Sequence, residues 1–101
     1  MTSEDKIYLG TRLKYVLEIE ASGFSMDTDN FCVDLIRGPK VIHLEKGELE
    51  YDDENWYVCF DTNELGPGII TAKVTAYVPD TDFADGIRTE VQKITLVPVY
   101  Y

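Results

Sequence analysis

The sequence is poor in basic residues, in cysteine and histidine, and in long apolar runs. Its 101 residues include 9 Lys and Arg against 19 Asp and Glu, which gives a formal net charge of −10 at pH 7. Because a nucleic-acid duplex repels this charge and the basic residues are scattered singly, we expect no nucleic-acid binding. No uncharged stretch approaches the roughly 20 apolar residues of a membrane helix, so we expect no membrane insertion. The electrostatically favoured partner is a basic protein.

Helix-forming patterns are also scarce. Only four Ala occur, and no segment carries a sustained apolar stripe at helical spacing, so we expect little more than one helical turn near residues 63–65. A chain of this size buries roughly 65% of its surface, which suits one domain over residues 1–101. The polar, acidic N-terminal residues differ from a secretory signal, which is basic and then apolar. We therefore expect a cytoplasmic protein without a signal peptide, or a mature fragment of a processed one.

Alternation of apolar and polar residues is the main pattern that is present. In the first such segment one face carries Leu13, Tyr15, Leu17 and Ile19, and the opposite face is mainly charged. This alternation is typical of a half-buried strand. Further segments of this kind lie at residues 31–35, 41–44, 49–51, 56–60, 70–78 and 87–97.

Turn-forming residues separate these segments. Gly, Pro, Asp and Asn gather at residues 21–23, 27–30, 37–39, 46–47, 52–55, 66–68 and 79–82. The last strand segment contains a phase slip between Val91 and Ile94, which is typical of a β-bulge. About seven strands at this spacing predict an all-β fold, a single antiparallel β-sandwich of the immunoglobulin-like type.

The two cysteines do not fit the inter-sheet disulfide of an immunoglobulin domain. The alternation places Cys32 on one face with Asp34, and it places Cys59 on one face with Tyr57 and Asp61. Both thiols are therefore expected to point away from the core, whereas that disulfide needs both to point inward. Since no metal-binding spacing of cysteine and histidine occurs either, we expect two free cysteines without a metal or redox role.

The remaining side chains of chemical interest favour structural roles. The lone histidine, His43, has no nucleophile near it in sequence and is expected on a strand surface. Trp56 is expected in the core, although Trp56 and Tyr57 together would also suit stacking against a sugar ring. A carbohydrate-binding or cell-surface adhesion module therefore stays an alternative. The sequence predicts no catalytic residue, no cofactor-binding residue and no metal ligand, and hence no enzyme.

The acidic segment at residues 80–86 has some features of a calcium loop. Asp80, Asp82 and Asp85 offer carboxylates in a glycine-bearing turn. An EF-hand is excluded, because Ala84 and Asp85 stand where it needs an oxygen ligand and a glycine. An irregular calcium site between strands, and with it a calcium-stabilised linker domain, remains an alternative. The structural interpretation is a turn in which the aspartates bind backbone amides and Arg88 pairs with a carboxylate.

Three segments read together resemble a known family. They are residues 7–12 (Ile-Tyr-Leu-Gly-Thr-Arg), 61–68 (Asp-Thr-Asn-Glu-Leu-Gly-Pro-Gly) and 76–91, which contain Pro-Asp-Thr-Asp-Phe-Ala-Asp-Gly-Ile-Arg-Thr-Glu-Val. The chain resembles small immunoglobulin-like β-sandwich domains of gut Bacteroidales, including Bacteroides, which prophage-like and other mobile elements carry. It is similar, more loosely, to N-terminal domains of phage baseplate upper and tail-fibre proteins. Ala84 departs from the pattern, which has Pro there.

This resemblance implies a non-enzymatic structural or interaction module. The implied setting is a phage tail or baseplate, into which the protein is incorporated after synthesis in the cytoplasm. The implied partners are further copies of the chain or other proteins of the particle. The family has no assigned biochemical activity, so the resemblance transfers no site residue and no cofactor.

Overall fold

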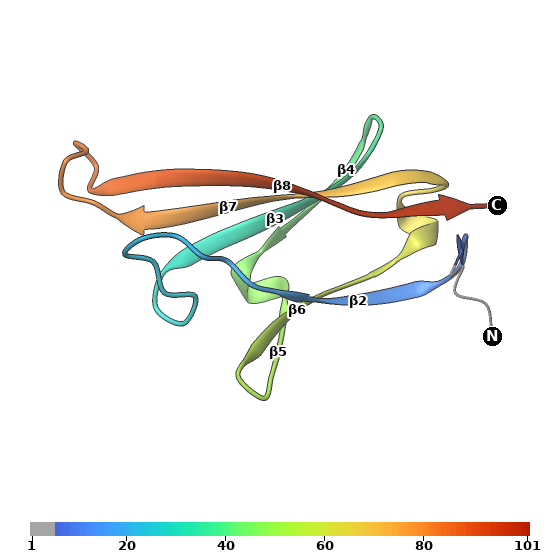
Figure 1. Ribbon diagram of the computed structural model, residues 1–101, viewed down its shortest axis with the longest axis horizontal. Helices are drawn as coiled ribbons and strands as arrows, with labels where there is room; N and C mark the ends of the chain where they lie inside the picture. Colours follow the sequence, from blue (N-terminus) through green and yellow to red (C-terminus); the bar gives the residue numbers. More distant parts are fainter. Residues whose placement is uncertain (1–5) are drawn as a thin grey trace.

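The computed structural model describes residues 6–101, which form two β-sheets packed face to face (Figure 1). The larger sheet has the strand order β1-β8-β7-β3-β4, and the smaller sheet has the order β2-β6-β5. The strands are β1 Ile7–Tyr8, β2 Arg12–Leu17, β3 Asn30–Arg37, β4 Lys40–Glu45, β5 Glu50–Asp52, β6 Asn55–Asp61, β7 Gly68–Pro79 and β8 Ile87–Tyr100. The predicted all-β fold is confirmed.

The strand count and directions differ from the prediction of about seven antiparallel strands. Residues 6–101 contain eight strands, and β1 runs parallel to β8, with Ile7 opposite Val99 and Tyr8 opposite Tyr100. Alternation cannot reveal a strand of two residues whose only partner lies at the other end of the sequence. The other seven strands lie on the segments that the alternation predicts.

Helical structure in the described residues is limited to two single turns. The turn η2, Thr62–Glu64, confirms the turn expected near residues 63–65, and a second turn, η1, covers Lys46–Glu48. The carboxylate of Asp61 accepts a hydrogen bond from the Asn63 amide at 2.9 Å, which caps η2. No helix in residues 6–101 is long and apolar enough to span a membrane.

The core lies between the centre of the larger sheet and the smaller sheet. Strands β3 and β7 contribute its largest share, and β2 and β6 close it from the other side. The core side chains of these four strands are Phe31, Val33 and Leu35, then Ile70, Ala72, Val74, Ala76 and Val78, then Leu17, Val58 and Phe60. Every second residue of β3 and β7 is buried here, as expected for strands that each present one face to a core.

The connection from β2 to β3, residues 18–29, covers the part of the larger sheet that lies beyond the end of β2 (Figure 1). Its Phe24 ring packs edge-on against Phe31, and the Trp56 ring packs edge-on against the same phenylalanine at 5.5 Å between centroids. The ammonium of Lys46 donates to the carbonyl of Asp29 at 2.9 Å and lies 5.3 Å from the Trp56 ring centroid. These contacts fix the connection to the sheet, and they confirm that Trp56 packs against the core.

Strand β8 contains the expected β-bulge, but at a later position than predicted. The register of β8 against β7 skips Leu96, between Thr95 and Val97. The predicted slip between Val91 and Ile94 was wrong because it treated both as core residues, whereas both are about half exposed, at 52% and 44%. They lie on opposite faces of a regular part of the strand.

We predict that Leu35→Ala lowers the free energy of unfolding by about 2 to 5 kcal/mol, because it leaves a cavity where the side chain is now fully buried. The matched control is Val41→Ala on the neighbouring strand, whose side chain is 56% exposed and whose loss should change stability by less than about 0.5 kcal/mol. Urea denaturation of both variants measures the difference. Equal losses would contradict the assignment of the core.

Candidate functional site

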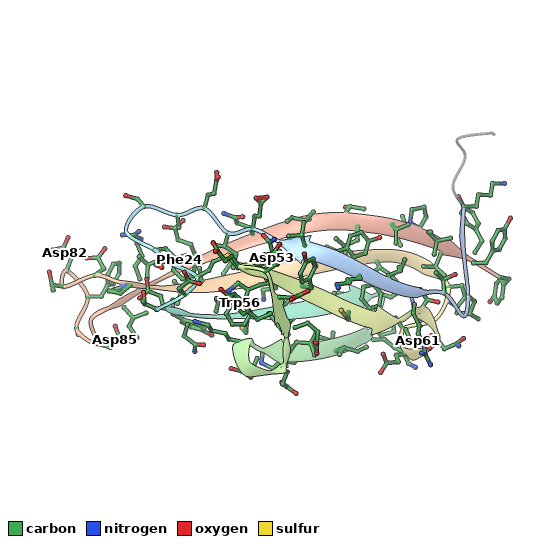
Figure 2. The ribbon with its side chains drawn as sticks, turned by 90° about the horizontal axis from the view of Figure 1, so that it is seen from below. Phe24, Asp53, Trp56, Asp61, Asp82 and Asp85 are labelled. Atoms are coloured by element: carbon green, nitrogen blue, oxygen red, sulfur yellow. The ribbon has the colours of Figure 1, made fainter. Side chains whose placement is uncertain are left out.

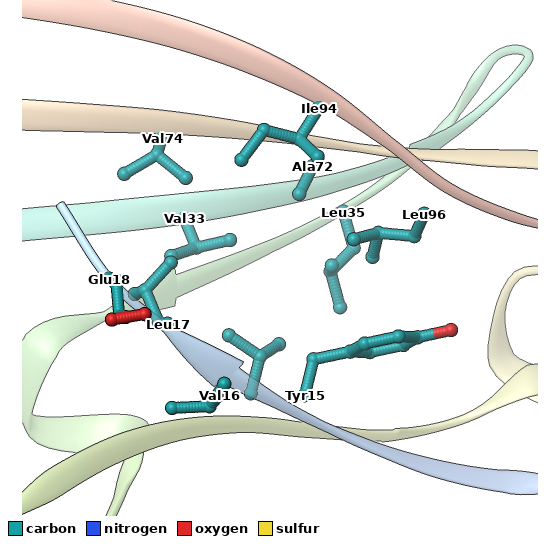
Figure 3. Close-up of a pocket in the computed structure, with 11 residues that line it drawn as sticks. Tyr15, Val16, Leu17, Glu18, Val33, Leu35, Ala72, Val74, Ile94 and Leu96 are labelled. Carbon is teal, nitrogen blue, oxygen red and sulfur yellow. The ribbon is translucent and has the colours of Figure 1, made fainter.

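An apolar groove opens between the free edge of β2 and the inner face of β8 (Figure 3). Its volume is about 210 Å³, and its lining is apolar except for Glu18 at the rim. The groove exists because residues 6–101 contribute three strands to the smaller sheet, and none of them lies beyond β2 to cover β8. Ile94, on the β8 side of the groove, therefore stays 44% exposed, and Val16, at the edge of the smaller sheet, is 52% exposed.

The walls of the groove are continuous with the core. Ala72, Val74, Val33 and Leu35 of the larger sheet form its floor, and Figure 3 shows the Tyr15 ring below Leu35. Burial raises the pKa of the Tyr15 hydroxyl, which stays protonated at neutral pH. Away from Glu18, the groove therefore offers an uncharged surface to an apolar side chain.

A second hollow continues from this groove and is acidic. It has a volume of about 300 Å³ and shares Leu17 and Glu18 with the apolar groove. Its carboxylates come from the end of β2, from the β2–β3 connection and from the turn before β6; they are Glu18, Glu20, Asp27 and Glu54. Trp56 also lines the hollow, and its ring nitrogen is buried without a hydrogen-bond partner among the described residues. The surface thus changes from apolar to negative along one path.

A polar cluster lies on the opposite, outer face of the larger sheet. The register of the β3–β4 hairpin places Cys32 opposite Glu45 and Asp34 opposite His43. The Nδ1 atom of His43 lies 2.6 Å from the Asp34 carboxylate, and its Nε2 atom bonds to the Glu45 carboxylate. The hydrogen bond to Glu45, and then that to Asp34, raise the pKa of His43 above its ordinary value.

Both cysteines are free and point away from the core, as predicted, but the pattern did not predict that Cys32 is buried. Cys59 is exposed, whereas Cys32 is 4% exposed although it lies on the outer face. The Tyr77 hydroxyl, 3.8 Å from the Cys32 sulfur, covers it from the adjacent strand β7. The hydrogen bond with Cys32 raises the pKa of Tyr77, so the hydroxyl stays protonated. Alternation gives the face of a side chain but not the neighbours that cover it.

The predictions from the sequence placed Cys32 and His43 separately, and they included no contact of either residue with Glu45. A signal for the connection was present in the turn at Gly38-Pro39. A tight hairpin that pairs residue 37 with residue 40 fixes every other pair of the two strands. The register alone would then have placed Cys32, His43 and Glu45 on one face.

The acidic segment at residues 80–86 forms the tip of the β7–β8 hairpin, where Asp82 and Asp85 lie far from Asp61 at the other end of the molecule (Figure 2). The Asp80 carboxylate accepts a hydrogen bond from the Asp82 amide at 3.0 Å and pairs with Arg88 at 2.7 Å. The Asp85 carboxylate accepts a hydrogen bond of 3.1 Å from the backbone amide of Ile87. The expected turn, with aspartates on backbone amides and an arginine on a carboxylate, is confirmed.

Comparisons of the chain with protein families, with curated proteins and with solved structures give no significant match. Function is therefore inferred from the groove, the hollow and the cluster themselves.

We predict that Asp80→Asn lowers the melting temperature at pH 7, and that the difference from the unchanged protein shrinks as the pH falls below about 4. The hydrogen bond from the Asp82 amide, and then the ion pair with Arg88, lower the pKa of Asp80 below its ordinary value of 3.8. A carboxylate whose pKa is lowered by folding stabilises the fold above its unfolded-state pKa, and this contribution disappears as the pH falls through its folded-state pKa.

Melting curves between pH 7 and pH 2, followed by circular dichroism, measure this effect. Asp82→Asn is the matched control, because the structure gives its carboxylate no hydrogen bond from any residue of 6–101 while its amide is retained. A loss of stability that does not vary with pH would contradict the role of the Asp80 charge.

Proposed function

We propose that the chain is a non-enzymatic interaction module of the immunoglobulin-like kind, which binds an extended segment of a partner protein in the groove beside β2. The observation that carries this proposal is that an edge of β2, with which no strand of residues 6–101 pairs, and an exposed apolar groove lie next to each other. A strand added at this edge would pair its backbone with β2 and direct alternate side chains towards β8. Strand addition needs a free edge for backbone pairing and a groove for the alternate side chains, and both lie beside β2.

The chemistry of the groove selects the kind of segment. Its apolar part suits aliphatic side chains at every second position, and the neighbouring hollow contributes the carboxylates of Glu18, Glu20, Asp27 and Glu54. A segment that is apolar and then basic matches both parts. A second copy of the chain is a poorer occupant, since two molecules of net charge −10 repel each other.

The proposed setting is a phage-derived particle, with this chain as a tail or baseplate component. The resemblance of residues 7–12, 61–68 and 76–91 to small domains of mobile elements in gut Bacteroidales supports this setting. Particles of this kind are assembled from many protein contacts, in which a domain that binds a strand has an obvious use. In this setting the partner is another protein of the particle.

We predict that the chain binds a short peptide of alternating valine and threonine that ends in paired lysines, and that Ile94→Glu weakens the binding by about tenfold or more, which corresponds to 1.4 kcal/mol. The substitution places a carboxylate in the apolar groove, where a bound side chain would remove its water. Fluorescence anisotropy with the labelled peptide measures the affinity.

Val91→Glu is the matched control. Val91 lies on the same strand at a similar exposure, 52% against 44%, but on the other face of the sheet. The same peptide ending in paired glutamates should bind more weakly than the lysine form. Equal losses for the two variants, or a dimer of the chain that Ile94→Glu dissociates in sedimentation velocity, would contradict the proposed partner.

The phage setting makes a separate prediction about the gene. We expect it to stand among genes for tail and baseplate proteins, because components of one particle are usually encoded together. Sequencing of the flanking region checks this. A neighbourhood without any gene for a particle protein would overturn the phage setting and leave the groove proposal standing.

A further inference from the structure

The polar cluster on the outer face brings together three different kinds of metal ligand. The sulfur of Cys32, a ring nitrogen of His43 and a carboxylate oxygen of Glu45 all lie within 4.8 Å of one another. In a tetrahedral zinc site, bond lengths of 2.0 to 2.3 Å place the ligand atoms about 3.3 to 3.8 Å apart. The upper limit of 4.8 Å exceeds that spacing by about 1.0 to 1.5 Å.

The orientation of His43 already suits a metal ligand. Its Nδ1 atom bonds to Asp34, which lies directly opposite it in the hairpin, and this leaves Nε2 on the side of Glu45. Histidines that bind metals almost always donate their other ring N–H to a carboxylate or a carbonyl. Asp34 therefore has the place of the residue that orients the ligand, and Nε2 is the atom that faces the ion.

The Cys32 sulfur gives the cluster its selectivity. Thiolate and imidazole favour zinc and other late transition metals, whereas calcium and magnesium take oxygen ligands. The sulfur lies beneath the Tyr77 hydroxyl at 3.8 Å, so the cluster has one buried ligand and two exposed ones. An ion bound here would lie at the surface above the buried thiol and could keep one position open to water.

We infer that Cys32, His43 and Glu45 form a binding site for one zinc-like transition-metal ion, with Asp34 as the residue that positions the histidine. On binding, the thiol proton and the proton that Nε2 of His43 shares with Glu45 both pass to solvent, so the sulfur binds as the thiolate and the histidine as the neutral imidazole. The ion connects β3 to the edge strand β4, on the face of the larger sheet opposite the groove. The inference is independent of the proposed function, because none of these residues lines the groove or the acidic hollow.

The test is a cobalt titration of the full, untagged chain after treatment with a chelator. We expect a thiolate-to-cobalt charge-transfer band that saturates at one ion per chain and disappears when zinc is added. Cys32→Ser should abolish the band. Cys59→Ser, the matched control at the exposed cysteine of the smaller sheet, should retain it. A band lost in Cys59→Ser and retained in Cys32→Ser, or no band in the unchanged protein, would overturn the inference.

Variants of the exposed residues keep the test valid if Cys32→Ser fails to fold. His43→Gln and Glu45→Gln should each weaken cobalt binding, with far-ultraviolet circular dichroism as the check on folding. Asp34→Asn should retain the band and weaken the affinity by about 10- to 100-fold, as expected for a residue that acts through a ligand. Unchanged affinity in both His43→Gln and Glu45→Gln would overturn the site even if a thiolate band is present.

Discussion

The packing of the smaller sheet against β3 and β7 is the interaction on which the rest of the structure depends. Three strands cover a sheet of five, so the inner face of the larger sheet is covered at its centre and open along β8. The β2–β3 connection closes part of the remaining surface, where Phe24 packs on Phe31. What is left uncovered is the groove between β2 and β8. The proposed docking site is thus a consequence of unequal sheet widths and needs no specialised loop.

Strand β3 connects this core to the polar cluster, because its two faces serve different purposes. Phe31, Val33 and Leu35 are fully buried in the core, while Cys32 and Asp34 point to the outer face. A slip of one residue would exchange the two sets and expose the phenylalanine. The burial that stabilises the fold therefore also holds the register of the cluster, and with it the neighbours of Cys32 and Asp34.

The sequence predicts well those features that depend on neighbouring residues. Alternation locates seven of the strands, and the turn at Asp80 is correct because its hydrogen bonds span only a few residues. Strand β1 was missed because its partner Val99 lies at the far end of the chain. The burial of Cys32 was missed for the same reason, since Tyr77 stands on a strand that is distant in sequence.

The candidate sites also differ in whether they depend on local or on distant parts of the sequence. The hairpin turn of β3 and β4 contains enough information to align Cys32 with Glu45, because that pairing is local. The groove, in contrast, could not be predicted from the sequence. It depends on which sheet each strand joins, and the alternating pattern of β2 or β8 is the same in either sheet.

The parallel pair of β1 and β8 determines how the domain would respond to mechanical tension. Ile7 and Tyr8 lie beside Val99 and Tyr100, so the two ends of the described chain leave neighbouring strands that run in the same direction (Figure 1). A pull between those ends would slide the strands along each other and load their hydrogen bonds together, instead of opening them one after another. A force applied at these two ends would therefore act on the β1–β8 pair before it acted on the core.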